Sequence, residues 1–145
     1  MDPMRALAKG ALAGLIGTAA MTAAQAAEMR VTGRAPSMVP GQVASKLLRL
    51  RPGDDEAMSR ISLGMHWAHG MTQGAVRALI GRFGLRGPAA AVAHFGLMWS
   101  GDAMLYKGLG ISPWPWSWSL EELTPDVGHK GLYAVVTSAA YDRLS

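Results

Sequence analysis

Four apolar segments follow one another along the chain, separated by short polar or proline-rich connections. They cover roughly residues 5 to 29, 58 to 83, 88 to 107 and 125 to 144. No charged residue occurs from 10 to 27, from 61 to 76 or from 88 to 101. A spanning helix needs about 20 mostly apolar residues, and long basic side chains at its ends can reach the membrane surface. We therefore expect one all-α domain over residues 1 to 145, an integral membrane four-helix bundle; a soluble helical bundle is the alternative.

Helix is expected for all four segments because they are rich in Gly and Ala, which are depleted in strands. Proline stands at a plausible first helical position in three places, namely Asp2-Pro3, Gly87-Pro88 and Thr124-Pro125.

Two connections carry patterns of their own. The stretch VPGQVASKLLRLR, residues 39 to 51, places Val43 and Leu47 on one side of a helix and Lys46 and Arg49 beside them. This predicts a short amphipathic helix at the membrane surface after the first span. The stretch GISPWPWSWSLEELTP, residues 110 to 125, alternates Trp with Pro and Ser, and proline excludes a regular helix there. It is either an interfacial connector or a lid over the end of the bundle.

Composition agrees with a membrane protein more than with other classes. Of the 145 residues 50% are hydrophobic and 17% are charged, below the usual share of about 25% for soluble domains. The chain has no cysteine, which excludes disulfides and thiolate metal sites. The net charge of +4 comes from basic residues at segment ends and not from a dense basic run. The expected partner is therefore the lipid bilayer and not nucleic acid.

The first segment carries a stripe of small residues at intervals of four. The stripe consists of Gly10, Gly14, Thr18, Thr22 and Ala26. Small residues at this spacing let another helix approach closely in lipid, so we interpret the stripe as a packing surface. It could face its own bundle, a second copy in a homo-oligomer, or a subunit of a larger membrane complex. A secretory signal peptide, cleaved after residues 24 to 26, is the competing interpretation of this segment.

The second segment carries the most suggestive polar side chains. Ser62, His66, His69, Gln73 and Arg77 fall on one face of a helix. His66 and His69 are three residues apart, so both imidazoles could approach one ion, one haem edge or one proton chain. The alternative is that each imidazole hydrogen-bonds a neighbouring helix.

Other segments offer partners for this face. The fourth segment places His129, Tyr133, Thr137 and Tyr141 at intervals of four, and the third contributes His94 and Asp102. A carboxylate inside a membrane is costly, so Asp102 should be paired with His, Arg or Lys, or lie solvated at the interface. Glu28 is expected at the interface, and His94 in an interhelical hydrogen bond. The predicted polar interior, which would handle protons or an ion, consists of His66, His69, Gln73, Asp102, His129 and Tyr133; whether it binds a metal is left open.

Three functions remain possible, and none is enzymatic, because the chain lacks the G-x-S-x-G, H-E-x-x-H and Walker motifs. The first is proton or small-cation handling by the polar interior, since imidazoles titrate near neutral pH. The second is an accessory or scaffold subunit that docks through the small-residue stripe. The third, weaker possibility is a haem b protein with two axial histidines; otherwise no cofactor is predicted.

Several stretches between residues 65 and 144 resemble one bacterial family. They are MHWAHGMTQGAVRAL, GPAAAVAHFGLMW, ISPWPWSWSLEEL and VGHKGLYAVVTSAAYDRL. Together they look like the YagU-like inner-membrane proteins, and His66 and His129 match the recurring histidines of that family. This chain is shorter and its first connector differs. The resemblance implies a multi-pass protein of the bacterial inner (plasma) membrane, loosely tied to acid resistance, without an assigned biochemical activity.

Topology follows from the number of spans. Four spans place both termini on the same side of the membrane. Arg5, Lys9, Arg82, Arg86 and Arg143 favour the cytoplasm for that side, although the first connector is also basic.

Overall fold

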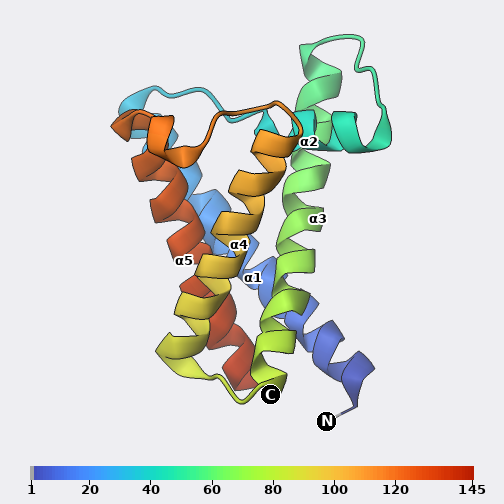
Figure 1. Ribbon diagram of the computed structural model, residues 1–145, viewed down its shortest axis with the longest axis vertical. Coiled ribbons are helices and arrows are strands. Elements are labelled where there is room, and N and C mark those ends of the chain that lie inside the picture. The colour runs from blue at the N-terminus through green and yellow to red at the C-terminus, as the bar shows by residue number, and fades with distance from the viewer. Residues whose placement is uncertain (1) are drawn as a thin grey trace.

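The computed structural model describes residues 2 to 145, which form five α-helices and no strand (Figure 1). The helices are α1 (Pro3–Thr32), α2 (Val39–Leu48), α3 (Asp55–Arg82), α4 (Gly87–Gly108) and α5 (Leu120–Leu144), with a 3-10 turn at Pro115–Ser117. The expected all-α fold is confirmed. The four long helices form the body of the molecule, and α2 lies across one end (Figure 1). Both chain termini lie at the opposite end (Figure 1).

Helix boundaries follow local capping chemistry. The side chain of Asp54 accepts a hydrogen bond of 2.8 Å from the amide of Ala57 and so caps the start of α3. Gly33 ends α1 in the left-handed conformation, with a φ of 71°, which glycine adopts without strain. The predicted amphipathic helix is present as α2, which buries Val43 and Ala44 against α3.

The last helix begins earlier than the sequence patterns predicted. It starts at Leu120, so residues 120 to 124 are helical and Pro125 lies inside the helix. A capping box explains the difference: Ser119 Oγ accepts from the amide of Glu122, and the Glu122 carboxylate accepts from the amide of Ser119. Expecting the proline-rich connector to exclude helix up to residue 125 was therefore wrong at its carboxyl end.

The helices α1 and α3 cross at very close range. A Cβ atom built on Gly10 would lie 2.5 Å from the carbonyl oxygen of Gly74, and one built on Gly74 would lie 2.7 Å from Cα of Gly14. Only glycine allows two backbones to approach this closely. Further along α1, Thr18 packs over Gly70. The small-residue stripe of α1 thus faces α3 of its own bundle.

The interior combines apolar residues, many of them small, with several polar and charged ones, and many large apolar side chains are exposed. Fully buried residues include Ala13, Thr18, Arg77, His94 and Thr137. Large apolar side chains exposed on the long helices include Leu12, Ile16, Leu63, Val92, Leu97, Met104, Leu132 and Val135. By length and hydropathy along the sequence, α1 is the one described helix that could cross a membrane.

Candidate functional site

Three helices bring charged side chains together around Asp102. This residue lies on α4 and is 3% exposed. Its Oδ1 atom is 3.1 Å from Nε2 of His69 on α3, and its Oδ2 atom is 3.1 Å from Nζ of Lys130 on α5. The sequence predicted that Asp102 would pair with a basic residue, and this geometry shows two such partners.

Lys130 also contacts a second carboxylate. Its Nζ atom lies 3.0 Å from Oδ1 of Asp126, one turn earlier on α5, and 5.1 Å from the centre of the Tyr106 ring. The other oxygen of Asp126 accepts a hydrogen bond of 2.9 Å from the indole of Trp99. We call His69, Asp102, Asp126 and Lys130 the charged cluster. It holds two carboxylates against one ammonium group, so its net charge is −1 with His69 neutral and zero with His69 protonated.

His66 does not join this cluster. Its Nε2 atom lies 2.9 Å from the hydroxyl of Thr22 on α1. The same hydroxyl lies 2.7 Å from the carbonyl oxygen of Thr18, and when it donates there, the imidazole donates to Thr22. His66 and His69 are therefore turned toward different helices, α1 and α4. The two imidazoles do not meet at one ligand, although their spacing on the helix allowed it.

His129 belongs to a separate group at the end of the bundle where α1 ends. Its Nε2 atom lies 3.6 Å from Oε2 of Glu28. Glu28 forms a close ion pair of 2.6 Å with Arg34, in the connection after α1. The hydrogen bonds that the Arg34 guanidinium donates to the Glu28 carboxylate raise the pKa of that guanidinium above its ordinary value. Glu28 is thus paired, and it ties α1 to its following connection and to α5.

Neutral polar groups fill the interior between the charged cluster and the end that carries the termini. The hydroxyl of Tyr133 donates to the carbonyl oxygen of Gly70 at 2.6 Å. Nε2 of His94 lies 2.9 Å from the carbonyl oxygen of Gln73, the interhelical hydrogen bond that its sequence context predicted. Among residues 2 to 145, the side-chain oxygens of Gln73 and Thr137 are buried without a hydrogen-bond partner. Each of these oxygens can still accept a hydrogen bond.

A second ion pair lies near the end that carries the termini. Arg77 is 0% exposed; its Nε atom donates to Ser138 at 3.0 Å and its Nη2 atom donates to Asp142 Oδ1 at 2.6 Å. The other oxygen of Asp142 accepts from the amide of Gly87 at 2.8 Å, at the start of α4. This pair ties α3, α4 and α5 together.

Polar side chains therefore run along the whole inner face of α5. They are Asp126, Lys130, Tyr133, Thr137, Ser138, Tyr141 and Asp142. Sequence analysis recognised Tyr133, Thr137 and Tyr141 but missed Lys130 and Asp126. The signal for these two was present, because residues four apart with opposite charge are neighbours on a helix. The predicted interior residues are thus distributed over several separate contacts.

No group of three or more His, Asp or Glu side chains within residues 2 to 145 is arranged to hold a metal ion. No family model, curated protein or solved structure matches this chain.

Proposed function

We propose that this chain is a four-span membrane protein whose charged cluster handles protons or a small monovalent cation. The observation that carries the proposal is a set of charges centred on the largely buried Asp102 and Lys130, with His69 and Asp126 partly exposed beside them, in a bundle with many apolar side chains on its outer surface. Ionisable groups within a membrane protein face its interior and mark paths for protons or ions.

The outer surface of each long helix supports four spans. Along α1, no exposed position between Lys9 and Arg30 is charged. Corresponding uncharged outer faces lie between Arg60 and Arg82 on α3, between Arg86 and Lys107 over α4, and between Glu122 and Arg143 on α5. Each interval covers about 20 residues, or roughly 30 Å of helix, which matches the hydrocarbon thickness of a bilayer.

The low hydropathy of three of these helices has a simple cause. The polar residues that reduce the hydropathy of α3, α4 and α5 include Arg77, Asp102 and Lys130, and all three point inward. A window average counts them as if they faced lipid. The exposed side chains are the ones that a bilayer would contact, and Leu97 and Val135 represent them at 59% and 58% exposure.

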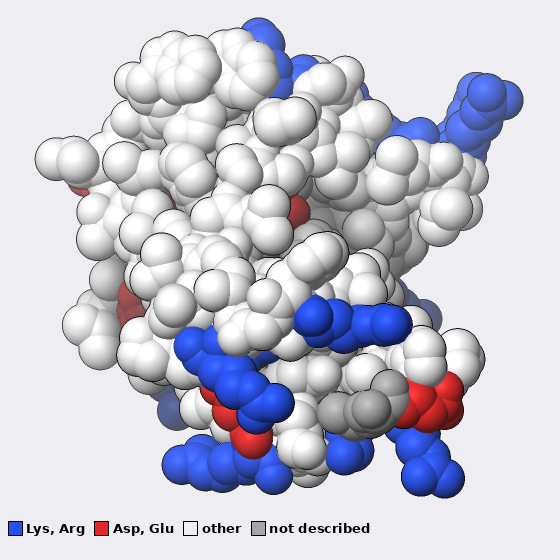
Figure 2. Space-filling model, turned by 60° about the horizontal axis from the view of Figure 1, so that its bottom comes forward, with Lys and Arg blue, Asp and Glu red and all other residues white. Residues whose placement is uncertain are grey.

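The ends of the bundle suit the two membrane surfaces. Lys and Arg side chains lie around the end that carries the termini (Figure 2), and others, among them Lys46, Arg49 and Arg51, lie at the opposite end, so both ends suit lipid headgroups. The opposite end carries α2 and the Trp-rich connection (Figure 1). Trp116 is 79% exposed there, as expected for an interfacial anchor. The bacterial inner membrane is the proposed location, in keeping with the likeness to YagU-like proteins.

The charge balance of the cluster gives it a chemical role. With two carboxylates and one ammonium group, the cluster lacks one positive charge in a buried site, where an uncompensated charge is costly. A proton on His69 or a monovalent cation beside Asp102 supplies it. Binding and release of that charge would alter the contacts between α3, α4 and α5. Tyr133 and Thr137 extend the polar path along α5 toward the other end.

The two other functions lose their specific support. Because the small-residue stripe of α1 packs on α3, it is not an exposed surface on which a partner could dock. Because His66 and His69 turn to different helices, they do not form a pair of facing haem ligands.

Ion flux into liposomes tests the proposal. Wild-type protein should dissipate a pH gradient, read with an enclosed pH dye, or a Na⁺ or K⁺ gradient. The Asp102→Asn variant should lower that flux at least tenfold, and it should still fold because Lys130 keeps its pair with Asp126. Glu121→Gln, which removes an exposed carboxylate outside the span, is the matched control. Equal flux in Asp102→Asn and wild type, or no flux in wild type, would overturn the proposal.

A further inference from the structure

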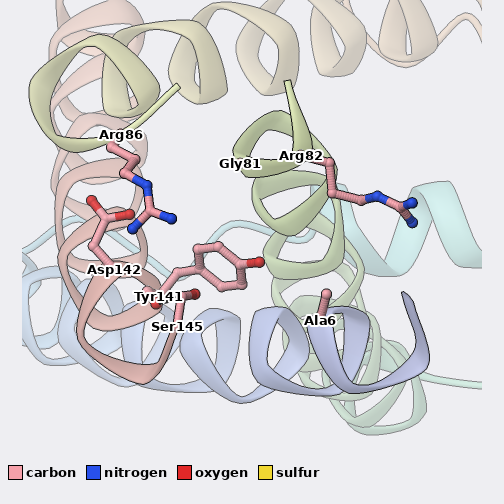
Figure 3. A pocket seen from close by; sticks show the side chains of 7 residues that line it. All are labelled: Ala6, Gly81, Arg82, Arg86, Tyr141, Asp142 and Ser145. Carbon is pink, nitrogen blue, oxygen red and sulfur yellow. Dashed lines mark hydrogen bonds between the residues drawn. The ribbon is translucent and has the colours of Figure 1, made fainter. Parts of the chain in front are cut away.

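A cavity opens at the end of the bundle that carries both termini, away from the charged cluster. Its volume is about 330 Å³. Gly81 and Arg82 line it from α3, Arg86 from the α3 to α4 connection, and Tyr141 and Asp142 from α5 (Figure 3). The size is at the lower limit of small-molecule sites, which start at about 300 Å³.

An unpaired donor group lies near this cavity. Nη1 of the fully buried Arg77 has no hydrogen-bond partner among the described residues, although Nε and Nη2 of the same side chain are both bonded. A Cβ atom on Gly81 would lie 3.2 Å from this Nη1 atom and 3.0 Å from the Tyr141 ring. Nη1 lies behind Gly81 and is not itself part of the cavity lining, because Arg77 is 0% exposed.

The cavity is positively charged. Its carboxylate, Asp142, is already neutralised, because one oxygen accepts from Arg77 and the other from the amide of Gly87. The side chain of Arg86 reaches over Asp142 and Tyr141 (Figure 3) and forms no ion pair with any residue from 2 to 145. Arg82 stands at the edge, its guanidinium directed away from the other lining side chains (Figure 3).

We propose that this cavity binds a phosphate group, with the guanidinium group of Arg86 and the hydroxyl of Tyr141 as donors. Arginine binds phosphate through two N–H groups at once, which suits the guanidinium group of Arg86. The volume exceeds that of inorganic phosphate and leaves room for the glycerol of a lipid headgroup. The lipid source rests on the proposed four spans, which would place this end of the bundle at the level of lipid phosphates. The site is independent of ion movement through the charged cluster.

Thermal unfolding of the full chain in detergent tests the site. The probes are inorganic phosphate and the soluble short-chain lipid dihexanoyl phosphatidylglycerol, with dihexanoyl phosphatidylcholine for comparison. Midpoint shifts against ligand concentration give an apparent affinity. We expect phosphatidylglycerol to bind, and Arg86→Gln to weaken this binding at least tenfold. Tyr141→Phe, which keeps the ring beside Arg77, should weaken it about threefold.

The control is Arg143→Gln, which removes an exposed positive charge from the same end but not from the cavity. It should change the affinity by less than twofold. Tighter binding of phosphatidylglycerol than of inorganic phosphate identifies a lipid site, whereas equal affinities identify free phosphate as the ligand. Equal losses in Arg86→Gln and Arg143→Gln, or no midpoint shift with either anion, would overturn the proposal.

Discussion

Nζ of Lys130 lies 3.1 Å from Oδ2 of Asp102, a contact that joins α5 to α4 inside the bundle. Replacing Lys130 with Met would leave Asp102 and Asp126 without their ammonium partner. Breaking a buried pair from one side costs about 3 to 5 kcal/mol. Lys130→Met should therefore unfold far more readily than wild type when helix content is followed by circular dichroism in detergent. Lys107→Met, which removes an exposed charge at the end of α4, should stay close to wild type.

The double variant Lys130→Met with Asp102→Asn separates charge from shape. It removes one charge of each sign, so it should recover part of the stability that Lys130→Met loses. If the double variant is less stable than Lys130→Met alone, the contact stabilises the bundle by packing and not by charge compensation.

The close crossing of α1 and α3 gives a second prediction. Gly14→Ala would place a methyl group against the backbone of Gly70, so the helices must separate. The cost should be about 1 to 3 kcal/mol. Gly96→Ala is the control, because a Cβ atom there meets nothing within 4 Å, and alanine favours helix by up to about 1 kcal/mol. Opposite signs of the two midpoint shifts are expected; equal shifts would mean that α1 and α3 do not cross at this point.

The capping box at the start of α5 gives a third prediction. Ser119→Ala removes the hydroxyl that accepts from the Glu122 amide, which should cost about 1 kcal/mol of stability. Ser117→Ala, an exposed serine in the 3-10 turn, should cost little. Hydrogen exchange at the amides of Glu122 and Leu123, which bond to Ser119, should quicken in Ser119→Ala only. Fast exchange at these amides in wild type would instead support a helix that begins at Pro125.

The Trp-rich connection between α4 and α5 gives a fourth prediction. Trp116 stacks on Trp114, with 5.1 Å between ring centres, and is exposed. In bilayers, its fluorescence should be quenched most by lipids brominated close to the headgroup. Trp116→Phe should remove that shallow component, whereas Trp67→Phe, on α3, should remove a deeper one. A Trp116 that no brominated lipid quenches would place this connection in water.

The sequence was informative where one residue type has one physical use. Proline predicted the starts of α1 and α4, and the cost of a buried carboxylate predicted a basic partner for Asp102. The sequence was less informative about which neighbouring helix each polar side chain contacts. His66 and His69 share a helix face, yet α1 supplies a hydroxyl to one and α4 a carboxylate to the other.

Lys130 was overlooked for a related reason. Next to His129 and Gly131 it has the sequence context of an interfacial residue, and only the placement of α4 beside α5 shows that it is buried. Likewise, hydropathy along α3, α4 and α5 averages inward and outward residues, so the apolar outer surface is visible only once the bundle is assembled.

The central claim is that the outer faces of α1, α4 and α5 contact lipid together with that of α3. The chain has no cysteine, so single cysteines can carry spin labels without background. Labels at the exposed positions Ile16, Leu97 and Val135 should, in bilayers, collide readily with oxygen and rarely with a water-soluble nickel chelate. A label at Glu121 should show the reverse. Nickel accessibility at Leu97 and Val135 as high as at Glu121 would contradict the membrane bundle.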